Sequence, residues 1–188
     1  MKATQILVVA AVLALSAACA SQQPTATSSS SSHKTSHHAK AGNTSSAPSV
    51  IAECRTSDLR LSLANREGTA GSTYVDVVLT NTSAHTCSTG GFGGVSFVGD
   101  GNGTQIGAAA IRVGTGKAFT LRPGEHANAT LQETDPGVYS PARCKPTRVD
   151  GLRVYPPNQT ASLFVSQAGM ACANDKVQLL HLQAYKPA

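Results

Sequence analysis

Turn signals interrupt the chain at short intervals after residue 68, and this spacing limits the fold more than any other feature. Glycine tolerates a positive φ and proline fixes φ, so clusters of these residues with Asp or Asn mark turns. The segments between the turns carry no amphipathic helical pattern, and a parallel sheet would need crossover helices. The spacing therefore favours antiparallel strands. The turn signals are Gly68 to Gly71, Asp100 to Gly103, Pro123-Gly124, Asp135 to Gly137, Asp150-Gly151 and Pro156 to Asn158.

Alternation of apolar and polar residues between these turns predicts strands. Leu59, Leu61 and Leu63 show the period-two pattern of a half-buried strand. Val75 to Leu79 belongs to a strand that is apolar enough on both faces to be central. Roughly eight short strands predict an all-β fold, an antiparallel immunoglobulin-like β-sandwich. The remaining strands are predicted at residues 95–98, 118–121, 127–132, 152–155, 162–165 and 177–184.

Four cysteines in the later part of the chain form an even set. In an exported protein such a set indicates two disulfides. No CxxC or CxxH spacing supports a zinc site instead. Four cysteines permit three pairings. We favour Cys54 with Cys87, because an antiparallel strand pair brings these positions together, and Cys144 with Cys172, because they flank two later strands in the same way.

Residues 1–18 have the pattern of a lipoprotein signal peptide. The apolar run from Ile6 to Ala18 is too short for a comfortable membrane span. The segment from Leu15 to Cys19 looks like a bacterial lipobox, in which the cysteine is lipidated and becomes the mature N-terminus, although the pattern prefers Leu at the position of Ser16. We therefore expect Cys19 to be the lipid-attachment residue and the protein to be anchored to the outer face of the plasma membrane. Cleavage after Ala20 would instead release a soluble, secreted protein.

Residues 19–50 are predicted to form a disordered tether between the lipid anchor and a β-sandwich domain at residues 51–188. This segment is rich in Ser, Thr and His and has almost no large apolar side chains. As a flexible coil it would hold the domain roughly 30 Å from the membrane on average. His33, His37 and His38 form a cluster that can bind Cu or Zn weakly, or can simply belong to a polar spacer.

The net charge of the domain and the absence of known catalytic motifs argue against several classes of function. From residue 51 onward, 12 Lys and Arg against 10 Asp and Glu leave a net charge of +2, so we expect no nucleic-acid partner. GxSxG, HExxH and paired-carboxylate motifs are absent, so we expect neither an enzyme nor a cofactor. A triad of His85 with Asp76 and a serine is conceivable, while His126 and His181 are scattered. Met170 is the only methionine after the signal peptide, so copper binding would depend on the histidines.

A glycine cluster and a few apolar residues in expected loops are the candidate interaction surface. Gly90 to Gly94 lacks the spacing of a phosphate-binding loop and is predicted to be a turn beside Cys87. The chain contains no Trp, which weakens carbohydrate binding. Binding surfaces are commonly built on loops. The candidate residues are Phe92, Tyr155, Pro156 and Pro157.

Short motifs spread over nearly the whole domain are more specific than any of these patterns. They are Cys54-x3-Asp58-Leu59, Gly71-Ser72-Thr73-Tyr74, Thr80-Asn81-Thr82, Cys87, Gly91-Phe92-x-Gly94-Val95, Leu121-x-Pro123-Gly124, Cys144 and Gly151-Leu152-Arg153-Val154-Tyr155-Pro156-Pro157. Together they resemble the domain of unknown function 4232, found in exported and lipid-anchored proteins of actinobacteria. Gly93 departs from the pattern, which has Pro there. The resemblance implies a fold and a location, and it carries no activity or site residues.

The sequence thus predicts a lipid-anchored extracytoplasmic binding or interaction module. Its partners would be the plasma membrane, through the lipid, and a protein or cell-wall ligand. An alternative from another class is a Cu/Zn-binding envelope protein that uses its histidines, and a hydrolase is a distant third.

Overall fold

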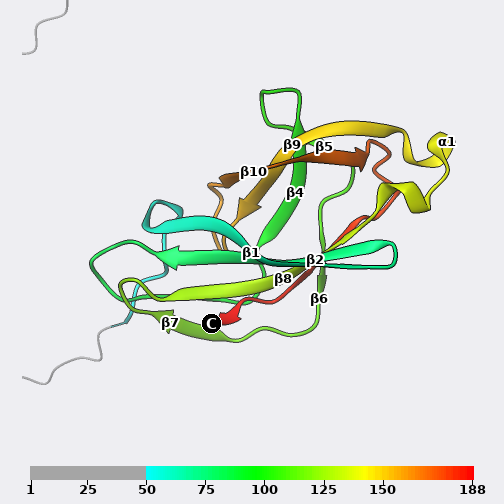
Figure 1. The fold of residues 1–188 in the computed structure, drawn as a ribbon. Coiled ribbons are helices and arrows are strands. Elements are labelled where there is room, and N and C mark those ends of the chain that lie inside the picture. The colour runs from blue at the N-terminus through cyan, green and yellow to red at the C-terminus, as the bar shows by residue number, and fades with distance from the viewer. Residues whose placement is uncertain (1–49) are drawn as a thin grey trace, which may run out of the picture. The chain divides into compact units, whose positions relative to one another are not determined.

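A computed structural model describes residues 50–188, which form two packed layers of strands (Figure 1). The larger layer is a six-stranded sheet in the order β1-β2-β8-β11-β6, in which β12 also pairs with β8. Leu and Val side chains from both layers meet in the core. The strands of this sheet are β1 (Leu59–Thr69), β2 (Ser72–Asn81), β8 (His126–Thr134), β11 (Leu180–Gln183), β6 (Ile111–Val113) and β12 (Lys186–Pro187).

The second layer is a four-stranded sheet in the order β10-β9-β4-β5, and a small two-stranded sheet joins β3 to β7. The strands are β10 (Leu163–Cys172), β9 (Pro146–Tyr155), β4 (Gly94–Gly99), β5 (Thr104–Ile106), β3 (Cys87–Gly90) and β7 (Ala118–Leu121). Helical structure in the described part is limited to α1 (Pro141–Cys144) and two 3₁₀ turns, Thr56–Asp58 and Pro136–Val138. The prediction of an all-β antiparallel sandwich is confirmed.

The strand count and several strand lengths differ from the prediction. The structure has four further strands, β3, β5, β6 and β12, each of four residues or fewer. Alternation over so few residues is a weak signal, and of the described strands this short, β7 and β11 were predicted. β9 and β10 extend well beyond the predicted 152–155 and 162–165. An irregularity between Ser166 and Gly169 breaks the alternation along β10. One strand pair, β6 with β11, is parallel, contrary to the expectation of antiparallel pairing throughout.

The core is built around β2, which pairs with β1 on one side and β8 on the other. Val75, Val77 and Leu79 are buried on its inward face. Leu152 and Val154 of β9 are buried in the same cluster from the opposite sheet. The central position predicted for this strand is confirmed, and its burial explains why an apolar residue recurs at every second position.

Two disulfides close the domain with the predicted pairing. Cys54 is joined to Cys87, with a Cα–Cα distance of 4.9 Å, and Cys144 to Cys172, with a Cα–Cα distance of 4.5 Å. All four cysteines are buried. The first disulfide fixes the chain that precedes β1 to the start of β3, and the second joins α1 to the end of β10.

Asn81 is a buried polar residue at the end of β2 that organises the loop after it. Its amide nitrogen donates to the carbonyl oxygens of His85, at 2.9 Å, and Leu121, at 3.0 Å. Its Oδ1 accepts from the backbone nitrogen of Ser83 at 3.0 Å and from the Ser83 hydroxyl at 2.7 Å. The side chain therefore satisfies the buried Leu121 carbonyl and orders the partly buried loop after β2.

Replacing Cys144 and Cys172 together with Ala should lower the free energy of unfolding by about 3 to 4 kcal/mol, because closing a loop of this size removes conformational entropy from the unfolded chain. The two residues are separated by 28 positions. Urea denaturation followed by circular dichroism measures the change. Ser166→Ala, at an exposed position of β10, is the control. A loss below about 1 kcal/mol would show that the unfolded chain is already compact in this region.

Candidate functional site

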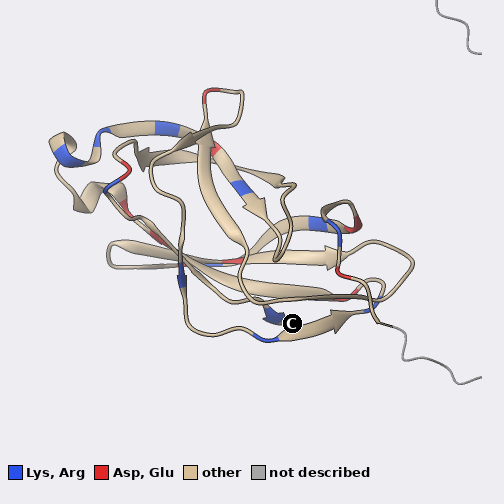
Figure 2. Ribbon diagram, turned by 180° about the vertical axis from the view of Figure 1, so that it is seen from behind, with Lys and Arg blue, Asp and Glu red and all other residues tan. Residues whose placement is uncertain are grey.

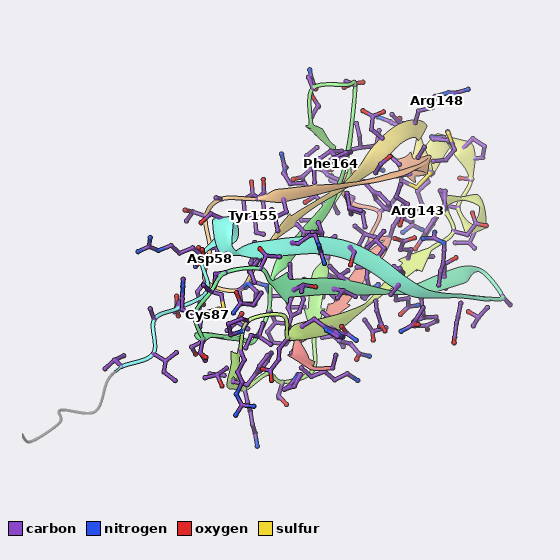
Figure 3. All side chains as sticks on the ribbon, turned by 60° about the vertical axis from the view of Figure 1, so that its left-hand side comes forward. Asp58, Cys87, Arg143, Arg148, Tyr155 and Phe164 are labelled. Atoms are coloured by element: carbon purple, nitrogen blue, oxygen red, sulfur yellow. A yellow bond between two sulfur atoms is a disulfide. The ribbon has the colours of Figure 1, made fainter. Side chains whose placement is uncertain are left out.

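The outer face of the four-stranded sheet carries the most distinctive surface of the domain. Leu152 and Val154 point into the core, so the residues that alternate with them on β9, Arg153 and Tyr155, lie on the outer face. Phe164 of β10 is the direct cross-strand partner of Arg153. Its side chain is 58% exposed. Figure 3 shows Phe164 on this sheet, away from Asp58 and Cys87, and Tyr155 nearer to Asp58.

A pocket of about 570 Å³ lies between Phe164 and the turn that joins β4 to β5. That turn rises above the sheet in Figure 1. The volume is within the usual range for small-ligand sites. We call this hollow the Arg153 pocket. Its lining residues are Val98, Gly101, Asn102, Gly103, Asp150, Arg153, Ser162, Leu163 and Phe164.

The Arg153 guanidinium is held in place by neutral groups. It donates to the carbonyl oxygen of Gly103 at 3.2 Å and to Oε1 of Gln105 at 3.0 Å. It lies over the Tyr155 ring, 5.8 Å from the ring centre, which is a cation–π geometry. Its Nε is buried and has no hydrogen-bond partner. No carboxylate within residues 50–188 forms an ion pair with Arg153.

Asp150 fixes the opposite wall of the Arg153 pocket. Its Oδ2 accepts from the backbone nitrogen of Gly101 at 2.8 Å. The β4–β5 turn is therefore attached to β9 at two points, through Asp150 and through Arg153. Anchored in this way, the turn forms a defined wall.

Gly151 makes room for the Phe164 ring. A Cβ at this position would lie 2.1 Å from the carbonyl oxygen of Val165 and 2.9 Å from Cε2 of Phe164. Both distances are below those that real Cβ atoms adopt, so any side chain here would displace the ring or the backbone. Gly151, Arg153 and Tyr155 come from one of the motifs on which the family resemblance rests.

The candidate interaction residues predicted from the sequence are less exposed than expected. Pro156 and Pro157 follow β9 in a turn, as predicted, but both are buried. Tyr155 is the last residue of β9, where the predicted strand 152–155 also ends, and it is half-buried. Phe92 lies between β3 and β4 and is also half-buried. Of these four residues, Tyr155 contacts the Arg153 pocket's guanidinium.

The glycine segment between β3 and β4 is packed against other elements. The backbone nitrogen of Tyr185 donates to the Gly91 carbonyl at 2.8 Å, and Nε of Arg112 donates to the Gly93 carbonyl at 3.1 Å. A Cβ on Gly93 would lie 2.6 Å from the Tyr155 carbonyl oxygen and 3.1 Å from the Tyr185 ring. Close packing explains the glycine at 93, and no helix follows the segment, as predicted.

The histidines of the domain do not come together. His85 lies in the loop after β2, with its Nε2 3.8 Å from Oδ2 of Asp58. His181 is on β11, within the predicted strand 177–184, and His126 is the first residue of β8, one position before the predicted strand 127–132. Residues 50–188 contain no group of three His, Cys, Asp or Glu residues that could hold a metal. The tether histidines and Cys19 lie outside the described residues, so metal binding by the tether stays a prediction.

The conceivable triad is not assembled. The carboxylate of Asp76 accepts from Nδ2 of Asn65 at 2.9 Å through one oxygen and from the hydroxyl of Thr130 at 3.1 Å through the other. His85 has Asp58 as its acidic neighbour instead. His85 and Asp76 therefore do not form the pair that such a triad would need.

Arg153 and Phe164 were not identified as site residues from the sequence, although the sequence spacing pointed to the position of Arg153. Arg153 and Tyr155 are two positions apart, and this spacing places both on one face of a strand. Phe164 stands between Leu163 and Val165. Three consecutive apolar residues do not show which of them faces outward, so its exposure could not be derived from the sequence.

Comparison with known proteins gives one match. The model of a family described as a domain of unknown function, DUF4232, matches residues 54–184. No curated protein and no solved structure matches the chain. Among residues 50–188, no helix has the length and apolar character needed to cross a membrane.

Stability should fall as the pH rises above about 10, the ordinary pKa of a tyrosine phenol. Burial raises the pKa of Tyr185 well above that value, so the unfolded chain loses this proton while the folded chain keeps it. The native state then binds more protons, and the free energy of unfolding decreases with pH. Denaturation at pH about 9 and about 11 measures the decrease.

Tyr185→Phe is the matched control for this pH effect. The Tyr185 hydroxyl is buried without a hydrogen-bond partner, so its removal leaves no partner unsatisfied. The variant should be less sensitive to alkaline pH than the parent. Identical pH dependence in both proteins would contradict the role assigned to Tyr185.

Proposed function

We propose that this chain, which belongs to the DUF4232 family, is an extracytoplasmic binding module anchored to the outer face of the plasma membrane through a lipid on Cys19. It captures a protein or cell-wall ligand at the outer face of its four-stranded sheet. Binding rather than catalysis is its function in this proposal.

The location is supported by two features of the chain. Both disulfides are of the kind that persists in oxidising compartments outside the cytosol. The apolar run ending at the lipobox-like segment from Leu15 to Cys19 supports export with lipid attachment. A lipidated N-terminus carries more than one acyl chain, which suffices for stable anchoring.

The observation that carries the binding function is the pairing of an exposed Phe164 with an Arg153 that lacks an acidic partner, beside a pocket of about 570 Å³. A single exposed apolar side chain is ordinary on a folded domain, so it is the combination of Phe164 with Arg153 and the pocket that favours binding. Aromatic residues and Arg are the side chains that most often dominate binding surfaces. The surface lies on sheet strands, which hold it more rigidly than a loop would.

The Cys19→Ala variant tests the anchor. The parent protein should fractionate with membranes and incorporate labelled fatty acid, because the thiol of Cys19 carries the lipid. The variant should lose the label and leave the membrane fraction. Ser16→Leu is the matched control, since it restores the residue that the lipobox pattern prefers and should keep the protein on the membrane. A Cys19→Ala protein that stays membrane-bound would contradict the anchor.

A photoreactive amino acid placed at Ser162 tests the binding function in intact cells. Ser162 is exposed and lines the Arg153 pocket, so illumination should give a discrete adduct. The same group at Thr120, an exposed position of β7, is the control and should give none. Phe164→Ala should reduce the Ser162 adduct. Equal yields at both positions would overturn the assignment of this face.

A further inference from the structure

We infer that the Arg153 pocket binds a single carboxylate attached to a ring, with the carboxylate at Arg153 and the ring against Phe164. This inference rests on the proposed binding function and names the ligand class of the same surface. An acidic sugar and an aromatic acid share this chemistry.

First, Arg153 has no direct ion-pair partner in the described part of the chain. Within residues 50–188 the ion pairs join Arg66 to Glu133, His85 to Asp58, and Arg122 to Glu125. Both acceptors of the Arg153 guanidinium are neutral, and its Nε is buried without an acceptor. A carboxylate beside a guanidinium forms short, charge-assisted hydrogen bonds.

Second, the Arg153 side chain is already oriented before any ligand binds. The Gly103 carbonyl and the Gln105 side chain hold two of its nitrogens, and the Tyr155 ring lies against its face. A long side chain ordinarily loses conformational freedom when it binds a ligand, and prior ordering removes that cost. The guanidinium is therefore already positioned to donate hydrogen bonds to a planar carboxylate.

The third step concerns the ring. Phe164 is 58% exposed beside Arg153, and the absence of a side chain at Gly151 allows its ring to lie close to the sheet. An aromatic face binds another ring by stacking or by apolar contact. Arg153 and Phe164 are cross-strand partners, so one ligand can reach both side chains at once.

The fourth step is the acidic wall. Asp150 lines the pocket and forms no ion pair in the described part of the chain. Its charge repels a second negative charge on the ligand, which disfavours a phosphate dianion. Its free oxygen can accept a hydrogen bond from a ligand hydroxyl. The pocket thus favours a monoanion over a polyanion.

Binding of small probes tests this ligand class. The protein is the chain from Ser21 onward, since its core and both disulfides lie within residues 54–185. Benzoate and glucuronate are titrated against their neutral counterparts, benzyl alcohol and methyl glucoside, and against inorganic phosphate. Amide and Arg Nε resonances in NMR spectra report binding at Arg153. We expect at least one acid to bind about tenfold or more tightly than its neutral counterpart and than phosphate.

Substitutions show which residues contact the bound acid. Arg153→Gln should weaken the acid at least about tenfold, the scale of one charge-assisted contact. Phe164→Ala should also weaken it, while Phe164→Leu keeps the apolar bulk without the ring. Arg148→Gln is the matched control, since Arg148 is exposed on the same strand, outside the pocket, and Figure 3 shows it away from Tyr155. Unchanged circular dichroism spectra confirm that each variant folds.

The outcomes separate the two acid sources. Binding of glucuronate alone assigns an acidic sugar, and binding of benzoate alone assigns an aromatic acid. Equal binding of acids and neutral counterparts, tighter binding of phosphate, or an equal loss in Arg148→Gln overturns the inference. So does the absence of binding by both acids up to about 10 mM, a concentration well above the range of weak specific binding. A Ser162 adduct in cells together with that absence would reject only the ligand class, whereas a missing adduct would reject the binding function.

Discussion

The two disulfides stabilise a core that contains few aromatic side chains. The core cluster consists mainly of Leu and Val, and Phe97 and Tyr185 are its buried aromatic residues. Aromatic side chains bury more area than aliphatic ones, so a core with few of them gains less free energy from burial. Each disulfide closes a segment of about 30 residues and restricts the unfolded chain accordingly. This restriction adds to the stability that burial of the core supplies.

At the end of the central strand β2, the polar residue Asn81 also links two segments of the chain. Asn81 is fully buried, and its side chain joins the loop after β2 to β7 through the carbonyl oxygens of His85 and Leu121. This loop leads to Cys87 and the first disulfide. An apolar residue here would remove the side-chain donor to the buried Leu121 carbonyl and the acceptor for Ser83. The presence of Asn in the Thr80-Asn81-Thr82 motif thus has a structural reason.

The sequence allowed the fold class, the central strand and both disulfides to be predicted, because each depends on local pattern or on simple antiparallel geometry. Short strands such as β5 were missed, since tertiary pairing rather than alternation defines them, although β7 and β11, also of four residues, were predicted. The parallel pairing of β6 with β11 is likewise a property of the assembled sheet. For the candidate site, Tyr155 was singled out and Phe164 was not. Exposure of Phe164 follows from the register with Arg153, which only the structure supplies.

The attachment of the β4–β5 turn ties the shape of the candidate site to its charge. Figure 2 shows acidic and basic positions on the strands beside this turn. Asp150 and Arg153 hold the turn by hydrogen bonds to Gly101 and Gly103, and both side chains also line the pocket. Displacement of the turn would release the guanidinium, and reorientation of the guanidinium would release the turn. Under the proposed binding function, sequence changes at the tip of the turn would alter ligand affinity without touching the ligand.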